Sequence, residues 1–194
     1  MQLHYQRELT LNPEKAALRK HLLEKRDSIS FDLMEIHSEK IVSKLMKTKI
    51  ISEAKSIGCY YSIGSEVQTV DLITRLLDEK KSVSLPVISN SAMSFRIIED
   101  IMKLEKNEFD IPEPKDNAII QEKHDVILIP CVGLDNEGNR VGYGQGFYDK
   151  YLEGDNAIKI ALSYSKQIVK SIPVSDKDIK MDWIITEKDV IKTS

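Results

Sequence analysis

The sequence has few of the features that mark secreted or membrane-spanning proteins. Only two cysteines, Cys59 and Cys131, occur among its 194 residues, and both lie in apolar, strand-like stretches. We therefore expect buried free thiols rather than a disulfide, which indicates a reducing, cytoplasmic location. Residues 1–11 have no apolar core of the kind found in signal peptides. No apolar run approaches the length of a transmembrane helix, so we expect no membrane partner.

The charge pattern excludes further classes. Lys and Arg total 28 against 31 Asp and Glu, which gives a net charge of −3 and no basic field suited to nucleic acid. The four histidines (His4, His21, His37 and His124) show no metal-ligand spacing, and we expect each at the surface. A chain of this length with 41% hydrophobic residues suits one domain with a single core.

Strand-like and helix-like segments alternate along the chain, which predicts an α/β fold. Asn12 and Pro13 form a helix start with a cap and a proline at the first helical position. Residues 1–12 are expected to be a loose extension, and residues 13–194 a single α/β domain. We predict helices over 13–28, 30–47, 69–80 and 147–153, and strands over 56–62, 82–88 (interrupted by Pro86), 93–98, 125–130, 157–164 and 183–191, the last as a strand or hairpin.

Glycine is scarce except in one stretch. The chain has eight glycines, and four of them fall within residues 138–146, between a predicted strand and a predicted helix. Gly142, Gly144 and Gly146 alternate, with Arg140 before them and Asp149 after them. Such a loop presents free backbone N–H groups to an anion, so the pattern predicts a phosphate site. A tight connection without a ligand is the alternative, and neither the Walker A motif nor the dinucleotide fingerprint fits.

Residues 130–152 resemble the signature of the 5-formyltetrahydrofolate cyclo-ligase family, also called 5,10-methenyltetrahydrofolate synthetases. That signature is Pro-Gly-x-x-Phe-Asp followed by Gly-x-Arg-x-Gly-x-Gly-x-Gly-Tyr-Tyr-Asp-x-x-Leu. The matching residues are Pro130, Asp135, Gly138, Arg140, Gly142, Gly144, Gly146, Tyr148, Asp149 and Leu152. The chain departs from it at Cys131, Leu134 and Phe147, and it has Tyr143 and Gln145 where some members have basic residues.

The resemblance implies a three-layer α/β/α sandwich with a mixed, mainly parallel central sheet. It also implies a reaction in which 5-formyltetrahydrofolate and ATP give 5,10-methenyltetrahydrofolate, ADP and phosphate, with Mg²⁺ as the metal. The implied partners are therefore a reduced folate and ATP, and we expect a monomer or weak homodimer.

The resemblance also assigns roles along the chain. Lys15, Arg140 and Tyr148 are the expected catalytic residues, and Asp149 and Asp182 the expected magnesium ligands. The expected nucleotide-binding residues are Lys15, Arg19, Gly138, Arg140, Gly142, Tyr143, Gly144, Gln145, Gly146, Phe147 and Tyr148. The expected folate-binding residues are Tyr61, Glu66, Tyr143, Gly144, Gln145, Gly146 and Tyr148.

Some alternatives stay open at this point. Arg19 either contacts ATP or braces the glycine loop, and Glu113 is either functional or merely exposed. A second hypothesis for the whole chain is a nucleotide-binding regulatory module without folate turnover. An isomerase or acyl-transferring enzyme on a similar sheet is a third hypothesis, and only Glu66 supports it.

Overall fold

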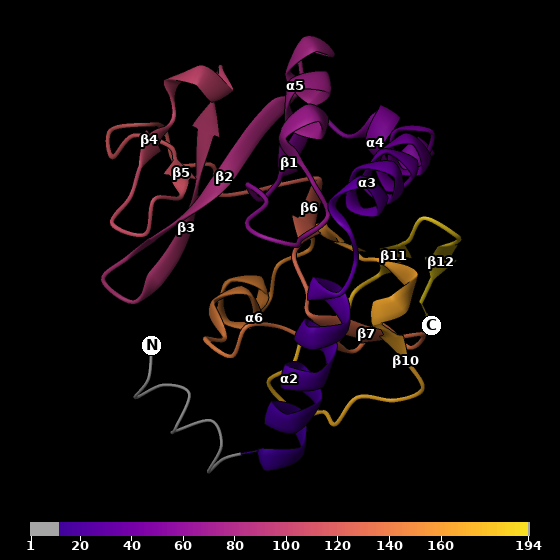
Figure 1. Ribbon diagram of the computed structural model, residues 1–194. Helices are drawn as coiled ribbons and strands as arrows, with labels where there is room; N and C mark the ends of the chain where they lie inside the picture. Colours follow the sequence, from indigo (N-terminus) through magenta and orange to yellow (C-terminus); the bar gives the residue numbers. More distant parts are fainter. Residues whose placement is uncertain (1–11, 194) are drawn as a thin grey trace.

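The structure is a computed structural model that describes residues 12–193. Its centre is a seven-stranded sheet with the order β12-β11-β9-β6-β1-β2-β3 (Figure 1). The strands from β11 to β2 run parallel, and the edge strands β3 and β12 are antiparallel to their neighbours. This arrangement confirms the expected α/β fold with a mixed, mainly parallel sheet. The strands are β1 Ser56–Gly58, β2 Ser82–Ser89, β3 Ala92–Ile98, β6 Val126–Ile129, β9 Ile158–Leu162, β11 Trp183–Ile185 and β12 Val190–Lys192.

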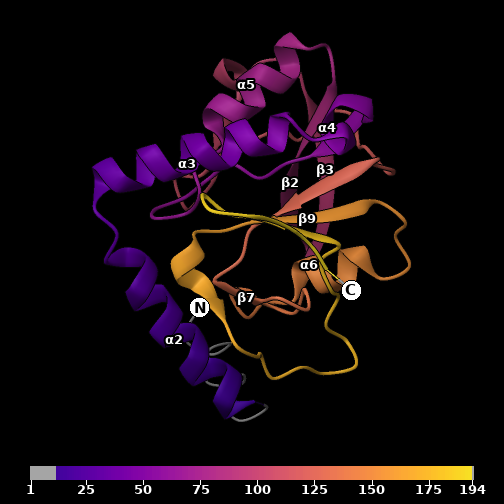
Figure 2. The same cartoon turned by 90° about the vertical axis from the view of Figure 1, so that its right-hand side faces the viewer.

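Layers of other elements cover both faces of the sheet. Three helices lie on one face (Figure 2): α3 Phe31–Met46, α4 Lys49–Glu53 and α5 Val70–Asp78. The short helix α6 Phe147–Leu152 and a three-stranded sheet with the order β10-β7-β8 lie on the other face. Buried apolar side chains fill both interfaces, so the central strands are covered on both sides, as parallel strands require.

Helix α2, Pro13–Asp27, stands apart from these layers and packs on the small sheet (Figure 2). Its Leu22 is fully buried against Val132, Val141 and Ile172. The small sheet consists of β7 Gly133–Asp135, β8 Arg140–Val141 and β10 Ile168–Val169. The remaining short elements are β4 Glu105–Lys106, β5 Pro112–Glu113 and the 3₁₀ turns η1 Ile101–Lys103 and η2 Ser165–Gln167.

Most predicted elements are confirmed, and the differences have local causes. Asn12 caps α2 by accepting a hydrogen bond from the Lys15 amide at 3.0 Å. Helix α4 and the β7–β8 hairpin were not predicted, because segments this short carry little periodic signal. The first predicted strand ends at Gly58 rather than at residue 62. Pro86 does not interrupt β2, because it lies beyond the part that pairs with β1.

The prediction that His124 lies at the surface is wrong. The residue is only 8% exposed, and its Nε2 lies 2.7 Å from the Ser84 hydroxyl. The ring also packs edge-on against Phe95. Burial lowers the pKa of His124, so the neutral ring is favoured there. His4 and the expected extension, except for Asn12, lie outside the described residues.

Within residues 12–193 no helix combines the length and the apolar character that a membrane crossing requires.

The β7–β8 turn depends on one glycine. Gly138 has φ of +89°, and a methyl group there would overlap the Met181 carbonyl oxygen. Gly138 also accepts a hydrogen bond from the Met181 amide at 2.9 Å. We expect Gly138→Ala to lower the free energy of unfolding by about 3 kcal/mol, from backbone strain and overlap together.

Gly64 offers a matched control, because its φ is +55° but a methyl group would meet open space. Gly64→Ala should cost only about 1 kcal/mol, from strain alone. Urea unfolding of both variants checks this. Equal losses in the two variants would contradict the role given to the Met181 contact.

Candidate active site

A cavity of about 510 Å³ lies at the carboxyl ends of the parallel strands. The chain leaves β1 toward β2 on one side of the sheet and later adds β6 on the other side. Such a switch in strand order leaves a crevice where open α/β sheets bind ligands. The loops after β1 and β6 supply Tyr60, Glu66 and Pro130 to its wall. The volume is typical of a pocket for a small molecule or cofactor.

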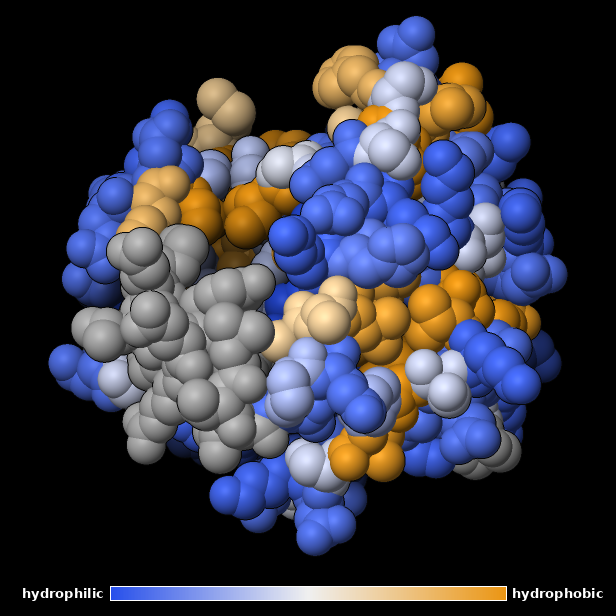
Figure 3. Space-filling view, turned by 60° about the horizontal axis from the view of Figure 1, so that its bottom comes forward, coloured by the Kyte–Doolittle hydropathy of each residue, from blue (hydrophilic) through white to orange (hydrophobic). Residues whose placement is uncertain are grey.

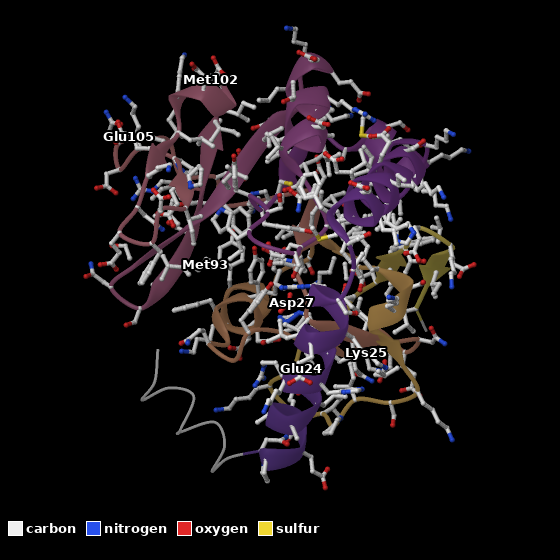
Figure 4. The ribbon with its side chains drawn as sticks, viewed as in Figure 1. Glu24, Lys25, Asp27, Met93, Met102 and Glu105 are labelled. Carbon is white, nitrogen blue, oxygen red and sulfur yellow. The ribbon has the colours of Figure 1, made fainter. Side chains whose placement is uncertain are left out.

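Apolar residues flank a hollow on the face seen in Figure 3. Much of the cavity wall is apolar and comes from β2, β3 and β5, through Ile88, Met93 and Pro112. Figure 4 shows Met93 on β3 and Asp27 at the carboxyl end of α2, with α6 between them in this view. The cavity therefore combines an apolar side, formed by strands, with a charged side, formed by α2 and the glycine loop.

Most of the expected site residues come together in this cavity. It is lined by Lys15, Arg19, Tyr61, Glu66, Arg140, Gly142, Tyr143, Gly144, Gln145, Gly146, Phe147, Tyr148 and Asp149. Two expected residues do not line it. Gly138 supports the β7–β8 turn, and Asp182 is exposed before β11, where it accepts a hydrogen bond from the Lys159 amide at 2.7 Å. The structure therefore places neither Gly138 nor Asp182 at the cavity that Asp149 lines.

Arg140 is held at the cavity by β8 and by Asp149. Its side chain is only 5% exposed, and Nη2 lies 2.8 Å from Asp149 Oδ1. The same carboxylate oxygen accepts a hydrogen bond from the Ile179 amide at 3.1 Å. The buried Nε of Arg140 has no hydrogen-bond partner within residues 12–193. A buried donor without a partner is costly, so this guanidinium is suited to receiving an anion.

Lys15 lies on the first turn of α2 and pairs with Asp178. Its Nζ is 2.7 Å from Asp178 Oδ2, which also accepts from the Ser175 amide at 2.7 Å. Burial opposes ionisation of Asp178, but these hydrogen bonds outweigh it and lower its pKa below the usual value. The carboxylate therefore stays ionised and fixes the ammonium group beside the cavity.

Arg19 braces the glycine loop. Its side chain is buried, and Nε donates to the Gly142 carbonyl at 2.6 Å. This contact supports the bracing role that the sequence left open for Arg19.

The glycine loop needs its glycines for conformation. Gly144 has φ of +94° and Gly146 has φ of +67°, a region that L-residues rarely adopt. Gly146 is also the residue from which α6 begins. The backbone thus bends twice within three residues, with Gln145 between the bends and Phe147 opening the helix.

Tyr148 lies at the junction of the loop and α6. Its hydroxyl is buried and has no hydrogen-bond partner within the described chain. Burial raises the pKa of this hydroxyl well above its usual value, so it remains a protonated donor. A polar atom of a bound ligand would satisfy it.

Glu66 is an almost fully buried carboxylate, 4% exposed, in the loop after β1. Its Oε2 accepts a hydrogen bond from the Ile63 amide at 2.8 Å, and its Oε1 accepts from the Tyr143 hydroxyl. Burial raises the pKa of Glu66, although the bonds from Tyr143 and Ile63 and the nearby Arg26 oppose that rise. A buried carboxylate in this setting binds N–H donors strongly.

Two charged residues at the site, Asp178 and Arg26, were not among those predicted from the sequence. Asp178 lines the cavity, while Arg26 reaches it through Tyr143. Arg26 follows Arg19 by two helical turns, so the spacing of Lys15, Arg19 and Arg26 on one face of a helix contained the signal.

The chain belongs to the 5-formyltetrahydrofolate cyclo-ligase family, because the family's sequence profile matches residues 11–187. The 5-formyltetrahydrofolate cyclo-ligase of Mus musculus is 28% identical over 92% of this chain and 96% of its own length. The 5,10-methenyltetrahydrofolate synthetase of Aquifex aeolicus superposes with a TM-score of 0.84 at 31% identity, covering 92% of each chain. The corresponding enzyme of Mycoplasma pneumoniae has a TM-score of 0.73 at 27% identity, over 90% of this chain and 99% of its own. The resemblance inferred from the glycine segment is confirmed.

Replacing Glu66 by Gln should make the free energy of unfolding depend less on pH between about pH 4 and pH 7 than it does in the wild type. The folded-state pKa of Glu66 is raised above its ordinary value of 4.5. Its contribution to stability is therefore fully present below about pH 4.5 and is lost as the pH rises through the raised pKa.

Gln does not ionise, so the free energy of unfolding of Glu66→Gln minus that of the wild type should increase between pH 4 and pH 7. Urea unfolding at the two pH values measures it. A stability difference that is the same at both would contradict the raised pKa.

Proposed function

We propose that this protein converts 5-formyltetrahydrofolate and ATP into 5,10-methenyltetrahydrofolate, ADP and phosphate. One observation carries the proposal: a single cavity joins the glycine loop and its cations to the buried carboxylate of Glu66. The glycine loop and its cations suit phosphate, and the Glu66 carboxylate suits the N–H donors of a pterin ring. We further propose that the protein acts in the cytoplasm as a monomer or weak homodimer, without nucleic acid as a partner.

The reaction needs activation of a poor leaving group. The formyl oxygen attacks the γ-phosphorus of ATP, the bond between the β–γ bridging oxygen and that phosphorus breaks, and ADP leaves. N10 then attacks the activated formyl carbon, the carbon–oxygen bond breaks, and phosphate departs with that oxygen. N10 gives up its proton to solvent. The protein mainly aligns the reacting atoms and stabilises the charge on the phosphoryl oxygens.

The nucleotide side of the cavity supplies that charge stabilisation. Arg140 and Lys15 are already fixed by carboxylates at 2.8 Å and 2.7 Å, so little reorganisation is needed when phosphate oxygens arrive. Backbone N–H groups of the loop from Gly142 to Gly146 add donors that carry no net charge. Arg19 holds this loop against α2.

The folate side supplies orientation. Glu66 receives the N–H donors of the pterin, and the apolar wall formed by Tyr61, Met93 and Pro112 accommodates the ring system. Tyr148 lines the same cavity, and its buried hydroxyl gains a partner from a bound ligand.

The carboxylates at the cavity fit Mg²⁺. Within residues 12–193 no cluster of three or more acidic, His or Cys side chains is set up to hold a metal alone. Mg²⁺ prefers one or two carboxylates together with phosphate oxygens and water. Asp149 and Asp178 line the cavity and would hold it, with Asp178 in the place expected for Asp182. When bound, the ion would neutralise charge on the phosphate oxygens.

A direct assay tests the proposed function. Purified protein is mixed with 5-formyltetrahydrofolate, ATP and Mg²⁺, and the near-ultraviolet absorbance of the methenyl product is followed. We expect product only when ATP and Mg²⁺ are both present. Folded protein that binds ATP but forms no product would leave a nucleotide-binding module and refute the cyclo-ligase function.

Arg140→Ala should lower kcat/KM for ATP by about 10²–10³, because it removes a charge that acts on the transferring phosphoryl group. Arg140→Lys keeps the charge but loses the planar fork, and its activity should be intermediate. Arg75→Ala is the control, because Arg75 is an exposed residue on α5 that pairs with Glu39. Steady-state kinetics measure these effects on variants whose melting curves are unchanged. Wild-type activity in Arg140→Ala would contradict the role assigned to Arg140.

Asp149→Asn should raise the Mg²⁺ concentration needed for half-maximal turnover by about tenfold or more. Asp182→Asn is the matched control, because Asp182 does not line the cavity. Turnover is titrated with Mg²⁺ after treatment with a chelator. A larger shift in Asp182→Asn than in Asp149→Asn would restore Asp182 as the metal ligand.

A further inference from the structure

Tyr143 belongs to the glycine loop, but its side chain reaches Glu66, the carboxylate proposed to bind the pterin of folate. Its backbone lies between Gly142 and Gly144, in the segment that suits phosphate. Its hydroxyl forms a hydrogen bond with Glu66 Oε1. The residue as a whole is 41% exposed, so the ring spans the cavity wall while its polar end reaches a buried partner.

The direction of this hydrogen bond follows from the neighbouring charge. Arg26 Nη1 lies 2.8 Å from the Tyr143 hydroxyl, and an arginine only donates. The hydroxyl oxygen therefore accepts from Arg26, and its single hydrogen points to Glu66. Burial and the Glu66 charge both raise the pKa of Tyr143, so that hydrogen is retained. The result is a charge-assisted hydrogen bond, stronger than one between neutral groups.

Arg26 is itself fixed at the end of α2. Its Nε donates to the Ser65 hydroxyl at 2.9 Å, and its guanidinium lies over the Tyr143 ring, 5.6 Å from the centroid. The Ser65 hydroxyl in turn donates to Asp27, whose place at the end of α2 is labelled in Figure 4. The Tyr143 hydroxyl is thus held from two sides.

Glu66 consequently has both of its oxygens engaged. Oε2 accepts from the Ile63 amide, and Oε1 accepts from Tyr143. A pterin that donates N–H groups to this carboxylate competes directly with the Tyr143 hydroxyl. The competing hydroxyl belongs to Tyr143, which lies in the loop proposed to bind phosphate. Gly142 and Gly144 on either side of Tyr143 let the backbone turn.

We propose that Tyr143 is a positioning residue that couples the two substrate sites. Without nucleotide its hydroxyl occupies Glu66, and nucleotide bound to the glycine loop withdraws it, which frees Glu66 for the pterin. Nucleotide therefore raises the affinity for folate, and folate raises the affinity for nucleotide by the same factor. This inference rests on the proposed function, because it takes folate and ATP as the two ligands.

Isothermal titration measures the coupling. The Kd of 5-formyltetrahydrofolate is determined with and without a non-hydrolysable ATP analogue and Mg²⁺, and the Kd of the analogue with and without folate. For the wild type we expect folate to bind about tenfold more tightly when the analogue is present, as expected for release of one charge-assisted hydrogen bond. The reciprocal pair of titrations must give the same factor.

Tyr143→Phe keeps the ring and removes the hydroxyl. We expect it to bind folate without nucleotide about tenfold more tightly than the wild type does, and to show a coupling factor near one. Tyr151→Phe is the control, because it removes a tyrosine hydroxyl from α6 at a residue that does not line the cavity. It should keep the wild-type coupling factor, and melting curves confirm that both variants are folded.

Three results would overturn the inference. These are a wild type without coupling, a Tyr143→Phe variant that keeps the wild-type coupling, and a variant that binds folate more weakly by the same factor in both conditions. The last is the result expected of a purely structural tyrosine. If the wild type still forms the methenyl product, the proposed function stands and only the coupling fails. A wild type that neither binds folate nor forms product would refute both.

Discussion

The close approach of α2 to the small sheet is the constraint on which the site depends. Helix α2 lies outside the layers of the central sheet, so its position is fixed mainly by Leu22 against Val132 and Val141. Gly133 permits this approach, because any side chain there would overlap Leu22. With the helix seated, Arg19 reaches the Gly142 carbonyl at 2.6 Å. The glycine loop has few side chains with which to hold itself, and α2 supplies the support that it lacks.

The same helix brings positive charge into a partly buried cavity, where an unpaired charge would be expensive. Three cations at the site accordingly have an acidic partner, directly or through a hydroxyl group. Lys15 pairs with Asp178, Arg140 with Asp149, and Arg26 reaches Glu66 through the Tyr143 hydroxyl. These pairs fix the cations before a ligand arrives. A phosphate or a magnesium ion that enters exchanges partners with an existing pair, which is less costly than desolvating a free charge.

Local pattern was enough to predict the α/β fold class, the capped start of α2 and the glycine loop, because each depends on residues close together in the sequence. Which of the predicted residues line the cavity, and which are buried elsewhere, depends on tertiary contacts. Gly138 shares the glycine cluster but faces Met181, and Asp182 shares an acidic pattern with Asp178 but precedes β11 on the surface. His124 has a polar sequence context, yet the fold buries it beside Ser84. Sequence spacing places such residues near a site but does not show which way each side chain points.

Most of the positive charge at the site comes from helix α2 and not from the glycine loop. Arg140 is the only cation within residues 138–146 of this chain, where Tyr143 and Gln145 stand between the glycines. Lys15, Arg19 and Arg26 lie on one side of α2 and supply charge to the same region. A cation on a helix stays in place when the loop moves, whereas a cation on the loop moves with it. The loop can therefore contain Tyr143 in place of a cation. When the loop moves, the hydrogen bond between Tyr143 and Glu66 changes, while the cations on α2 that phosphate requires stay in place.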